Sequence, residues 1–187
     1  MANVDIANEA LIRLGAATIT TLTDGSANAT LINSIFGDTR DMLVAGHPWS
    51  WAVTRADLVS NASTNYTDWS YMYDVPSALR LLSLYTASGS SSGEKWFVEG
   101  TYLYTNQVSA MMSYIQSISD TDTMSVPFKK ALGARIAFEI CLRITQNMTL
   151  RDRLFREYNY ELLQAKIVDG AVAKSDEEEP RLWTSAR

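Results

Sequence analysis

The sequence predicts a mainly helical α+β protein: a helical bundle of two N-terminal and two C-terminal helices, with a central antiparallel β-rich excursion and an extended C-terminal tail. Two observations lead to this fold class. Apolar residues recur at helical spacing in residues 1–48 and again in residues 120–173. Between them, in residues 49–119, the apolar period changes to two, which is the signal of strands. Residues 174–187 show neither period, and we expect them to form a docking tail.

The N-terminal region predicts two amphipathic helices that pack as a hairpin. The first should end at Gly15, because glycine readily adopts the left-handed conformation that closes a helix. Ser26 can cap the second helix, and Gly46 with Pro48 should end it. The apolar stripes that define these helices consist of Ile6, Ala7, Ala10, Leu11 and Leu14 in the first and of Leu31, Ile32, Ile35, Phe36, Thr39, Met42 and Leu43 in the second.

The central region predicts several short strands. A tight hairpin is expected at Glu99 and Gly100, between two aromatic-rich runs. Residues 61–68 and 88–93 are polar and rich in turn-forming residues, which indicates exposed loops. The connections are too short for crossovers, so the strands should be antiparallel. The alternating residues are Trp49, Trp51 and Val53, then Tyr71, Tyr73 and Val75, Leu82 and Leu84, Tyr102 and Tyr104, and finally Met112 and Tyr114.

Two further helices are predicted between residues 120 and 173. Ser125 can cap the first, and Pro127 falls in its first turn, where a missing N–H does no harm. Thr149 with Asp152 resembles a capping box for the last helix, which should fray near Gly170. The first helix has an apolar row and other faces made of small residues, so it should be central to the fold. The apolar row is Phe128, Leu132, Ile136, Ile140 and Ile144, the small residues are Ala131, Gly133, Ala134 and Ala137, and the last helix should bury Leu150, Leu154, Tyr158, Leu162 and Ala165.

Composition excludes several classes of protein. The chain has 187 residues, and its 16 Lys and Arg against 21 Asp and Glu give a net charge of −5. Binding nucleic acid over a broad surface requires clustered Lys and Arg to neutralise phosphates, and this acidic chain has no such excess of basic residues. No apolar run reaches the roughly 18 to 20 residues of a membrane helix, and no signal peptide begins the chain. A single cysteine, Cys141, fits a reducing compartment, so we expect a soluble protein made in the cytoplasm.

The sequence predicts no metal site and no cofactor. One histidine, His47, and one cysteine cannot supply a Cys/His zinc set. No phosphate-binding or dinucleotide-binding glycine motif occurs. Catalysis by His47 would require a nucleophile motif that the chain lacks. We expect His47 to have a structural role at a helix-to-strand corner.

Paired carboxylates are the remaining candidates for catalysis, since glycoside hydrolysis needs only two at a suitable spacing. The pairs are Asp38 with Asp41, Glu94 with Glu99, and Glu157 with Glu161. Nothing in the sequence indicates an apolar pocket that would raise the pKa of one member. We therefore expect no enzymatic activity.

A polar row interrupts the apolar helix that begins near Ser125. Arg135, Glu139 and Arg143 follow one another at intervals of four residues. One interpretation is a ladder of i,i+4 ion pairs on the surface. The other is a polar seam that faces another helix or a neighbouring subunit, and the sequence leaves both open.

Taken in order, segments along nearly the whole chain resemble the tail tubular protein A family, the head-to-tail adaptors of short-tailed bacteriophages. The likeness is sharpest at residues 40–41 and 47–52, where His-Pro-Trp precedes an aromatic residue and alanine, and continues at Arg55 and Ala56. The other similar segments are residues 6–15, 19–24, 71–76, 79–81, 96–100, 114–115, Asp120, 127–128, 131–135 and 183–187.

The resemblance implies a structural virion protein rather than an enzyme. Family members form a dodecameric ring below the portal, extend the DNA channel for ejection and seat a tail nozzle of the tail tubular protein B type. The C-terminal segment of such adaptors reaches the portal, which maps here onto portal-docking residues Arg181, Leu182, Trp183 and Arg187, while the β excursion would face the nozzle. Arg135, Glu139 and Arg143 are the candidates for a subunit interface. Residues 88–93 and 176–179 depart from the family pattern.

An acidic lumen would repel DNA phosphates, so that the duplex passes during ejection without specific binding. The acidic run at residues 176–179 supplies four of the 21 acids, so the rest of the chain is nearly neutral and the effect depends on where charges lie. Two other classes remain open: a tail-associated peptidoglycan hydrolase that uses a carboxylate pair, and a generic helical interaction module.

Overall fold

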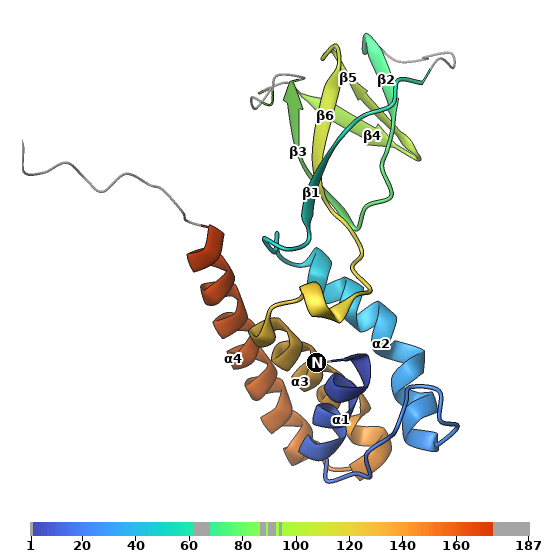
Figure 1. Cartoon of the computed structure of the whole chain (residues 1–187), viewed down its shortest axis with the longest axis vertical. Coiled ribbons are helices and arrows are strands. Elements are labelled where there is room, and N and C mark those ends of the chain that lie inside the picture. The colour runs from blue at the N-terminus through green and yellow to red at the C-terminus, as the bar shows by residue number, and fades with distance from the viewer. Residues whose placement is uncertain (1, 62–67, 87–88, 90–92, 94, 174–187) are drawn as a thin grey trace, which may run out of the picture. The chain divides into compact units, whose positions relative to one another are not determined.

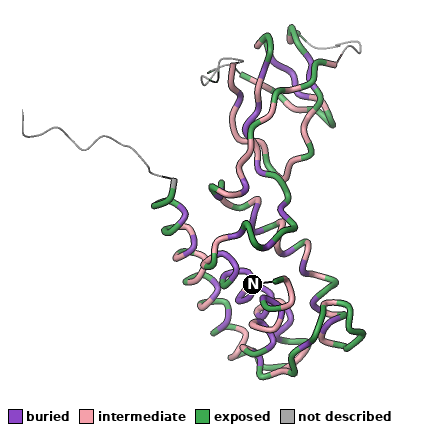
Figure 2. The backbone as a smooth tube through the Cα atoms, in the orientation of Figure 1, coloured by how far each residue is buried: buried purple, intermediate pink, exposed green. Residues whose placement is uncertain are grey.

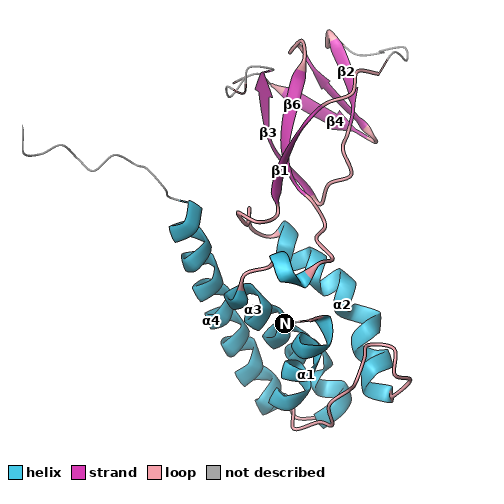
Figure 3. Cartoon of the chain, in the orientation of Figure 1, coloured by secondary structure: helices cyan, strands magenta, loops and turns pink. Residues whose placement is uncertain are grey.

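The computed structural model describes residues 2–61, 68–86, 89, 93 and 95–173 (Figure 1). Within this part, the chain forms four α-helices, a short 3-10 helix and six strands, so the predicted α+β class is confirmed. The chain divides into a helical unit, made of residues up to Thr39 and from Asp120 onward, and a β unit, Arg40–Ser119 (Figure 3). The first boundary falls within helix α2 (Ala27–Ala45), whereas the sequence placed it after residue 48.

The helical unit is built around α3 (Val126–Thr145), which lies against both α1 (Asn3–Arg13) and α4 (Met148–Ala173). The prediction that the two N-terminal helices pack as a hairpin is wrong, because α1 packs against α3 and not closely against α2. Buried residues follow the inner side of each helix, as the purple segments of Figure 2 show. In α2, Ile32, Phe36, Thr39 and Leu43 are buried as predicted, but Met42 is 48% exposed, so its place in the apolar stripe is wrong. The apolar faces predicted for α1, α3 and α4 are confirmed, although Ile144, Leu150 and Leu162 are only half-buried. The residues they bury include Ile6, Ala7, Ala10, Leu11 and Leu14 of α1, Phe128, Leu132, Ile136 and Ile140 of α3, and Leu154, Tyr158 and Ala165 of α4.

Small residues allow α1 to approach α3 closely. A Cβ atom added at Gly133 would lie 3.4 Å from the carbonyl oxygen of Ile6, so glycine leaves room for the neighbouring backbone. Ala134 and Ala137 in the same helix are fully buried. The prediction that this helix packs on several sides through small residues is therefore confirmed.

The predicted helix ends are set by local hydrogen bonds. Gly15 follows α1 with a φ of +67°. The Ser26 hydroxyl accepts from the N–H of Ala29 at 3.1 Å, and the Ser125 hydroxyl accepts from the N–H of Phe128 at 3.4 Å, which satisfies N–H groups that have no partner within the helix. These predictions are confirmed.

Asp24 orders the turn that leads into α2. Its carboxylate accepts hydrogen bonds from Ser26 and from the N–H of Thr20, and these bonds hold its pKa at about 2 instead of 3.8. The turn is therefore stabilised by the charged form of an exposed carboxylate.

The start and the end of α4 differ from the prediction. Asn147, and not Thr149, caps the helix, since its side-chain oxygen accepts from the N–H of Leu150 at 3.0 Å. Gln146 adopts a left-handed conformation with a φ of 53°, which ends α3 two residues before α4 begins. The helix also continues through Gly170 to Ala173. One exposed glycine costs about 1 kcal/mol in helix stability, which neighbouring turns can offset.

The β unit contains two three-stranded antiparallel sheets. The first has the order β1 (Val53–Asp57), β6 (Ala110–Ile115), β3 (Arg80–Thr86), and the second β2 (Tyr71–Asp74), β5 (Tyr102–Thr105), β4 (Trp96–Glu99). Side chains of both sheets meet in one apolar cluster around Leu84, Leu103 and Met112. The predicted antiparallel pairing is confirmed, as is the β4–β5 hairpin, in which Glu99 pairs with Tyr102 and Gly100 has a φ of +61°.

The prediction that Trp49 and Trp51 begin a strand is wrong, because β1 starts at Val53. Trp49 lies in a turn, is fully buried, and donates its indole N–H to the carbonyl oxygen of Leu43 at 3.1 Å. The last carbonyl groups of a helix have no partner within the helix, so the indole satisfies one at the end of α2. The rings of His47 and Trp51 flank Trp49 at 4.6 and 5.9 Å, which agrees with the structural role expected for His47.

Candidate interaction surfaces

The polar row of α3 is used within the chain. Arg135 donates from Nε to Oε1 of Glu139 at 2.6 Å, and Oε2 of Glu139 accepts from the hydroxyl of buried Thr39 on α2 at 2.9 Å. The first two residues of the row thus form the i,i+4 pair and also face a neighbouring helix. Arg143, the third, is exposed on α3. A role of the row at a subunit interface remains a prediction.

Arg135 also joins α3 to α4 through aromatic rings. Its guanidinium carbon lies 5.3 Å from the ring centre of Tyr158 and 5.4 Å from that of Phe138, distances at which a cation is attracted to a ring. Burial raises the pKa of the Tyr158 phenol above its ordinary value, and the charge of Arg135 opposes this rise. The cluster therefore holds three helices together through charge and packing.

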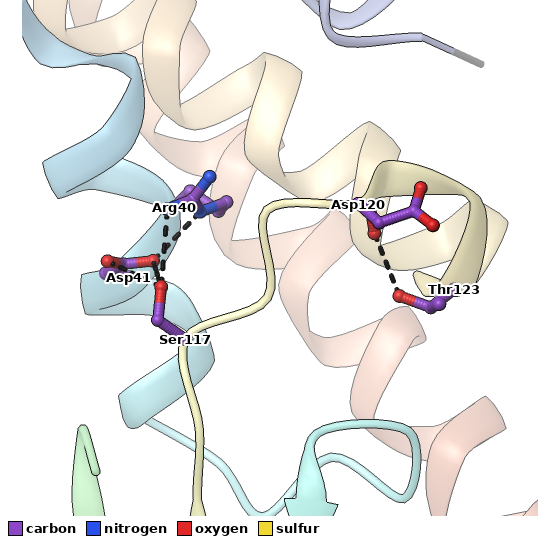
Figure 4. A network of polar contacts seen from close by, with 5 residues as sticks. All are labelled: Arg40, Asp41, Ser117, Asp120 and Thr123. Atoms are coloured by element: carbon purple, nitrogen blue, oxygen red, sulfur yellow. Dashed lines mark hydrogen bonds and ion pairs between the residues drawn. The ribbon is translucent and has the colours of Figure 1, made fainter. Parts of the chain in front are cut away.

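In the β unit, a second polar network ties the entry and exit of the chain to each other (Figure 4). Arg40 pairs with Asp41 at 2.8 Å, and the hydroxyl of Ser117, which follows β6, donates to Asp41 at 3.0 Å. The 3-10 helix η1 (Thr121–Thr123) has its own local bonds, since the hydroxyl of Thr123 donates to the carbonyl of Asp120 at 2.8 Å. Arg40 and Asp41 belong to the segment of sharpest family resemblance, and here they close the base of the excursion.

The candidate catalytic pairs are arranged as structural or surface groups. Asp41 is engaged by Arg40 and Ser117, whereas Asp38 is exposed. The carboxylate of Glu157 pairs with Arg13 of α1. Glu94 lies outside the described residues, so its pair with Glu99 has no described geometry.

The predicted portal-docking residues, Arg181, Leu182, Trp183 and Arg187, lie outside the described residues. Most of the two expected loops also lies outside the described residues, namely residues 62–67 of the first loop and residues 88 and 90–92 of the second.

The outer face of α4 carries apolar side chains that the sequence analysis did not single out. Tyr160, Leu163 and Ile167 are 61%, 55% and 55% exposed and occupy positions i, i+3 and i+7, on the side opposite the buried row. Three large apolar side chains in line on a solvent-facing surface are typical of an interaction site. The signal was present in the sequence, as a second apolar row at helical spacing.

The first turns of α4 form a groove beside this stripe, with a volume of about 710 Å³. Two exposed arginines, Arg153 and Arg156, supply its positive charge. The complete lining is Asn147, Thr149, Leu150, Arg153, Arg156 and Glu157.

A row of apolar side chains crosses the second sheet of the β unit. Met72, Tyr104 and Phe97 lie side by side in register across β2, β5 and β4, on the face away from the cluster around Leu103. The rings of Phe97 and Tyr104 stack with centres 6.1 Å apart, and Phe97 is 47% exposed. Met72 and Tyr104 are buried, so only Phe97 of this row is open to solvent.

Among the residues that the structure describes, no three His, Cys, Asp or Glu side chains come together as metal ligands. None of the helices in the described part of the chain is both long and apolar enough to cross a membrane. No protein-family model matches the chain, and no curated protein matches its sequence.

Proposed function

We propose that this protein is a head-to-tail adaptor of a short-tailed bacteriophage, a structural virion protein without enzymatic activity. The observation that carries the proposal is the ordered likeness to the tail tubular protein A family along nearly the whole chain, centred on residues 40–41 and 47–52. Support comes from what these residues do: Arg40 and Asp41 close the base of the β excursion, and Trp49 caps the end of α2. The most distinctive family segment is thus a structural corner rather than a reactive site.

In this proposal the four helices form the bundle of the adaptor family, and twelve copies assemble as a ring between the portal and a tail nozzle. A surface suited to protein contacts exists in the helical unit, on the outer stripe of α4. The β excursion faces the nozzle, and the tail docks on the portal through Arg181, Leu182, Trp183 and Arg187. Arg143 contributes to the contact between subunits, next to the Arg135–Glu139 pair. DNA passes through the ring without specific binding if acidic side chains line the channel, which depends on where the charges lie, because the chain outside residues 176–179 is nearly neutral.

Electron microscopy of the protein mixed with a cognate portal ring tests this proposal. We expect an added ring of density below the portal. A chain that lacks residues 175–187 should show the same circular dichroism but no portal binding, since the deletion removes the docking residues and leaves every described helix and strand in place. Portal binding by the shortened chain would contradict the docking assignment, and the absence of any complex with the complete chain would contradict the adaptor function.

A peptidoglycan assay separates the adaptor from a tail-associated hydrolase. We expect no clearing of a peptidoglycan suspension by the protein. Clearing that is lost in a Glu157→Gln or Asp41→Asn variant would refute the assignment as a purely structural protein.

A further inference from the structure

We propose that the acidic run at residues 176–179 of one copy binds in the groove at the start of α4 of a second copy, where Arg153 and Arg156 receive it. This inference rests on the proposed ring assembly and names a contact that would link its subunits. The acidic run lies outside the described residues and begins three residues after Ala173, the last residue of α4.

The groove is positively charged. Arg153 and Arg156 are both exposed and line it from α4. Glu157, which also lines it, pairs with Arg13 of α1, and Arg13 is shared with Glu9. The two arginines outnumber this single, partly compensated carboxylate, so the lining is positive on balance. The groove lies at the N-terminal end of α4, where the helix dipole favours an anion. Asp152 is exposed nearby, yet it is not part of the lining.

The acidic run is the strongest concentration of charge in the sequence. Asp176, Glu177, Glu178 and Glu179 are consecutive and supply most of the net charge of the chain. Carboxylates bind arginine through charge-assisted hydrogen bonds, often two at a time. The run and the groove are therefore complementary in charge, and Pro180 separates the run from the residues assigned to the portal.

The backbone of the run falls short of the groove of its own copy. Arg156 precedes Ala173 by 17 residues of continuous helix, which is about 26 Å at 1.5 Å per residue. The middle of the run follows Ala173 by four to five residues, a reach of about 16 Å at full extension. Side chains on a helix lean toward its N-terminus, which takes the guanidinium still further away. Even Glu179, the last residue of the run, follows Ala173 by six residues, about 21 Å at full extension, so binding within one copy would require a fully extended tail. The run of another molecule meets no such constraint, and the contact is therefore assigned to two copies.

Such a contact is head to tail, because the C-terminal end of one copy meets the beginning of α4 in the next. Contacts between two different surfaces build closed rings when the rotation between copies closes, and open chains otherwise. The groove contact leaves Arg181, Leu182, Trp183 and Arg187 for the portal, so each tail can bridge a neighbouring subunit and the portal.

The test is a titration of a fluorescein-labelled synthetic peptide, residues 174–187, with the full-length protein, followed by fluorescence anisotropy. We expect saturable binding that weakens about tenfold between about 50 and 500 mM NaCl, because the contact is ionic. The double substitution Arg153→Glu with Arg156→Glu should weaken binding about tenfold or more. A control with the same change in charge, Arg80→Glu with Lys130→Glu at two exposed sites, should leave the affinity within about twofold.

A reversed-charge peptide completes the test. A peptide with lysine at positions 176–179 should bind the Arg153→Glu, Arg156→Glu variant better than the unchanged protein. The proposal is overturned by absent peptide binding, by equal weakening in the control variant, or by a preference of the reversed peptide for the unchanged protein. A peptide that binds an isolated portal ring but not this protein would overturn the groove contact and leave the adaptor function standing.

Discussion

Replacing Trp49 tests whether the corner between α2 and β1 is an anchor of the fold. Its side chain is fully buried, and its indole N–H donates to the carbonyl of Leu43 at 3.1 Å. A buried tryptophan removes about 150–250 Å² from water, worth about 4–6 kcal/mol at about 25 cal/mol/Å². Alanine retains part of that area, so we expect Trp49→Ala to lower the free energy of unfolding by about 4 kcal/mol. Trp49→Phe keeps most of the packing but loses the donor to Leu43, and should cost about 1–2 kcal/mol.

Urea unfolding followed by far-UV circular dichroism measures both losses, and hydrogen exchange of the backbone amides in residues 43–57 locates them. The Tyr160→Ala variant is the control, since that aromatic side chain is 61% exposed and should change stability by less than about 0.5 kcal/mol. A Trp49→Ala variant that is as stable as the Tyr160→Ala variant would refute the anchoring role. Equal losses for Trp49→Ala and Trp49→Phe would show that the hydrogen bond, and not burial, dominates.

Three further predictions concern single groups. The pKa of Asp24 is lowered to about 2, so its contribution to stability should be complete above pH 4 and should decline as the pH falls through 2. The Asp24→Asn variant should lack this contribution. Urea midpoints measured across this pH range test the prediction, and an acid response of the variant equal to that of the unchanged protein would contradict it. Asn147→Ala should lower the free energy of unfolding in urea by about 1 kcal/mol, because it removes the cap of α4. Thr149→Ala should lower it by less than half as much. A larger loss in Thr149→Ala than in Asn147→Ala would show that Thr149 is the cap. Glu139→Gln should lower the free energy of unfolding by about 1–2 kcal/mol, because it removes the charge that pairs with half-buried Arg135. The control Glu161→Gln should change it by less than about 0.5 kcal/mol. Equal losses in urea unfolding would refute the role of Glu139 in linking the helices.

The predictions from sequence that succeeded depend on nearby residues. The caps at Ser26 and Ser125 and the end of α1 at Gly15 involve hydrogen bonds or backbone angles within a few positions. The same holds for the hairpin at Glu99 and Gly100. Residue type and spacing are sufficient there, because the interacting groups are neighbours in the chain.

The errors arose where a distant or competing group decided the outcome. Trp49 fitted the alternation of a strand. In the structure its side chain is instead buried in the core, where the indole N–H donates to a backbone carbonyl at the end of α2. Thr149 fitted a capping box, but Asn147 lies two residues earlier with an amide oxygen able to accept the same kind of bond. Short motifs cannot rank two such candidates, since the difference lies in where the preceding helix ends.

Sequence by itself determined the fold class, the order of helices and strands, the buried face of each helix and the net charge, because periodicity and composition act along the chain. Only the tertiary structure decided how the six strands divide into two sheets, that Glu139 reaches Thr39, and that Glu157 pairs with Arg13 of a distant helix. Those outcomes depend on contacts between residues as much as 144 positions apart. Such contacts form only when long loops close, and the entropy cost of that closure must be offset by the contacts themselves. A local sequence pattern does not show which distant residues will meet.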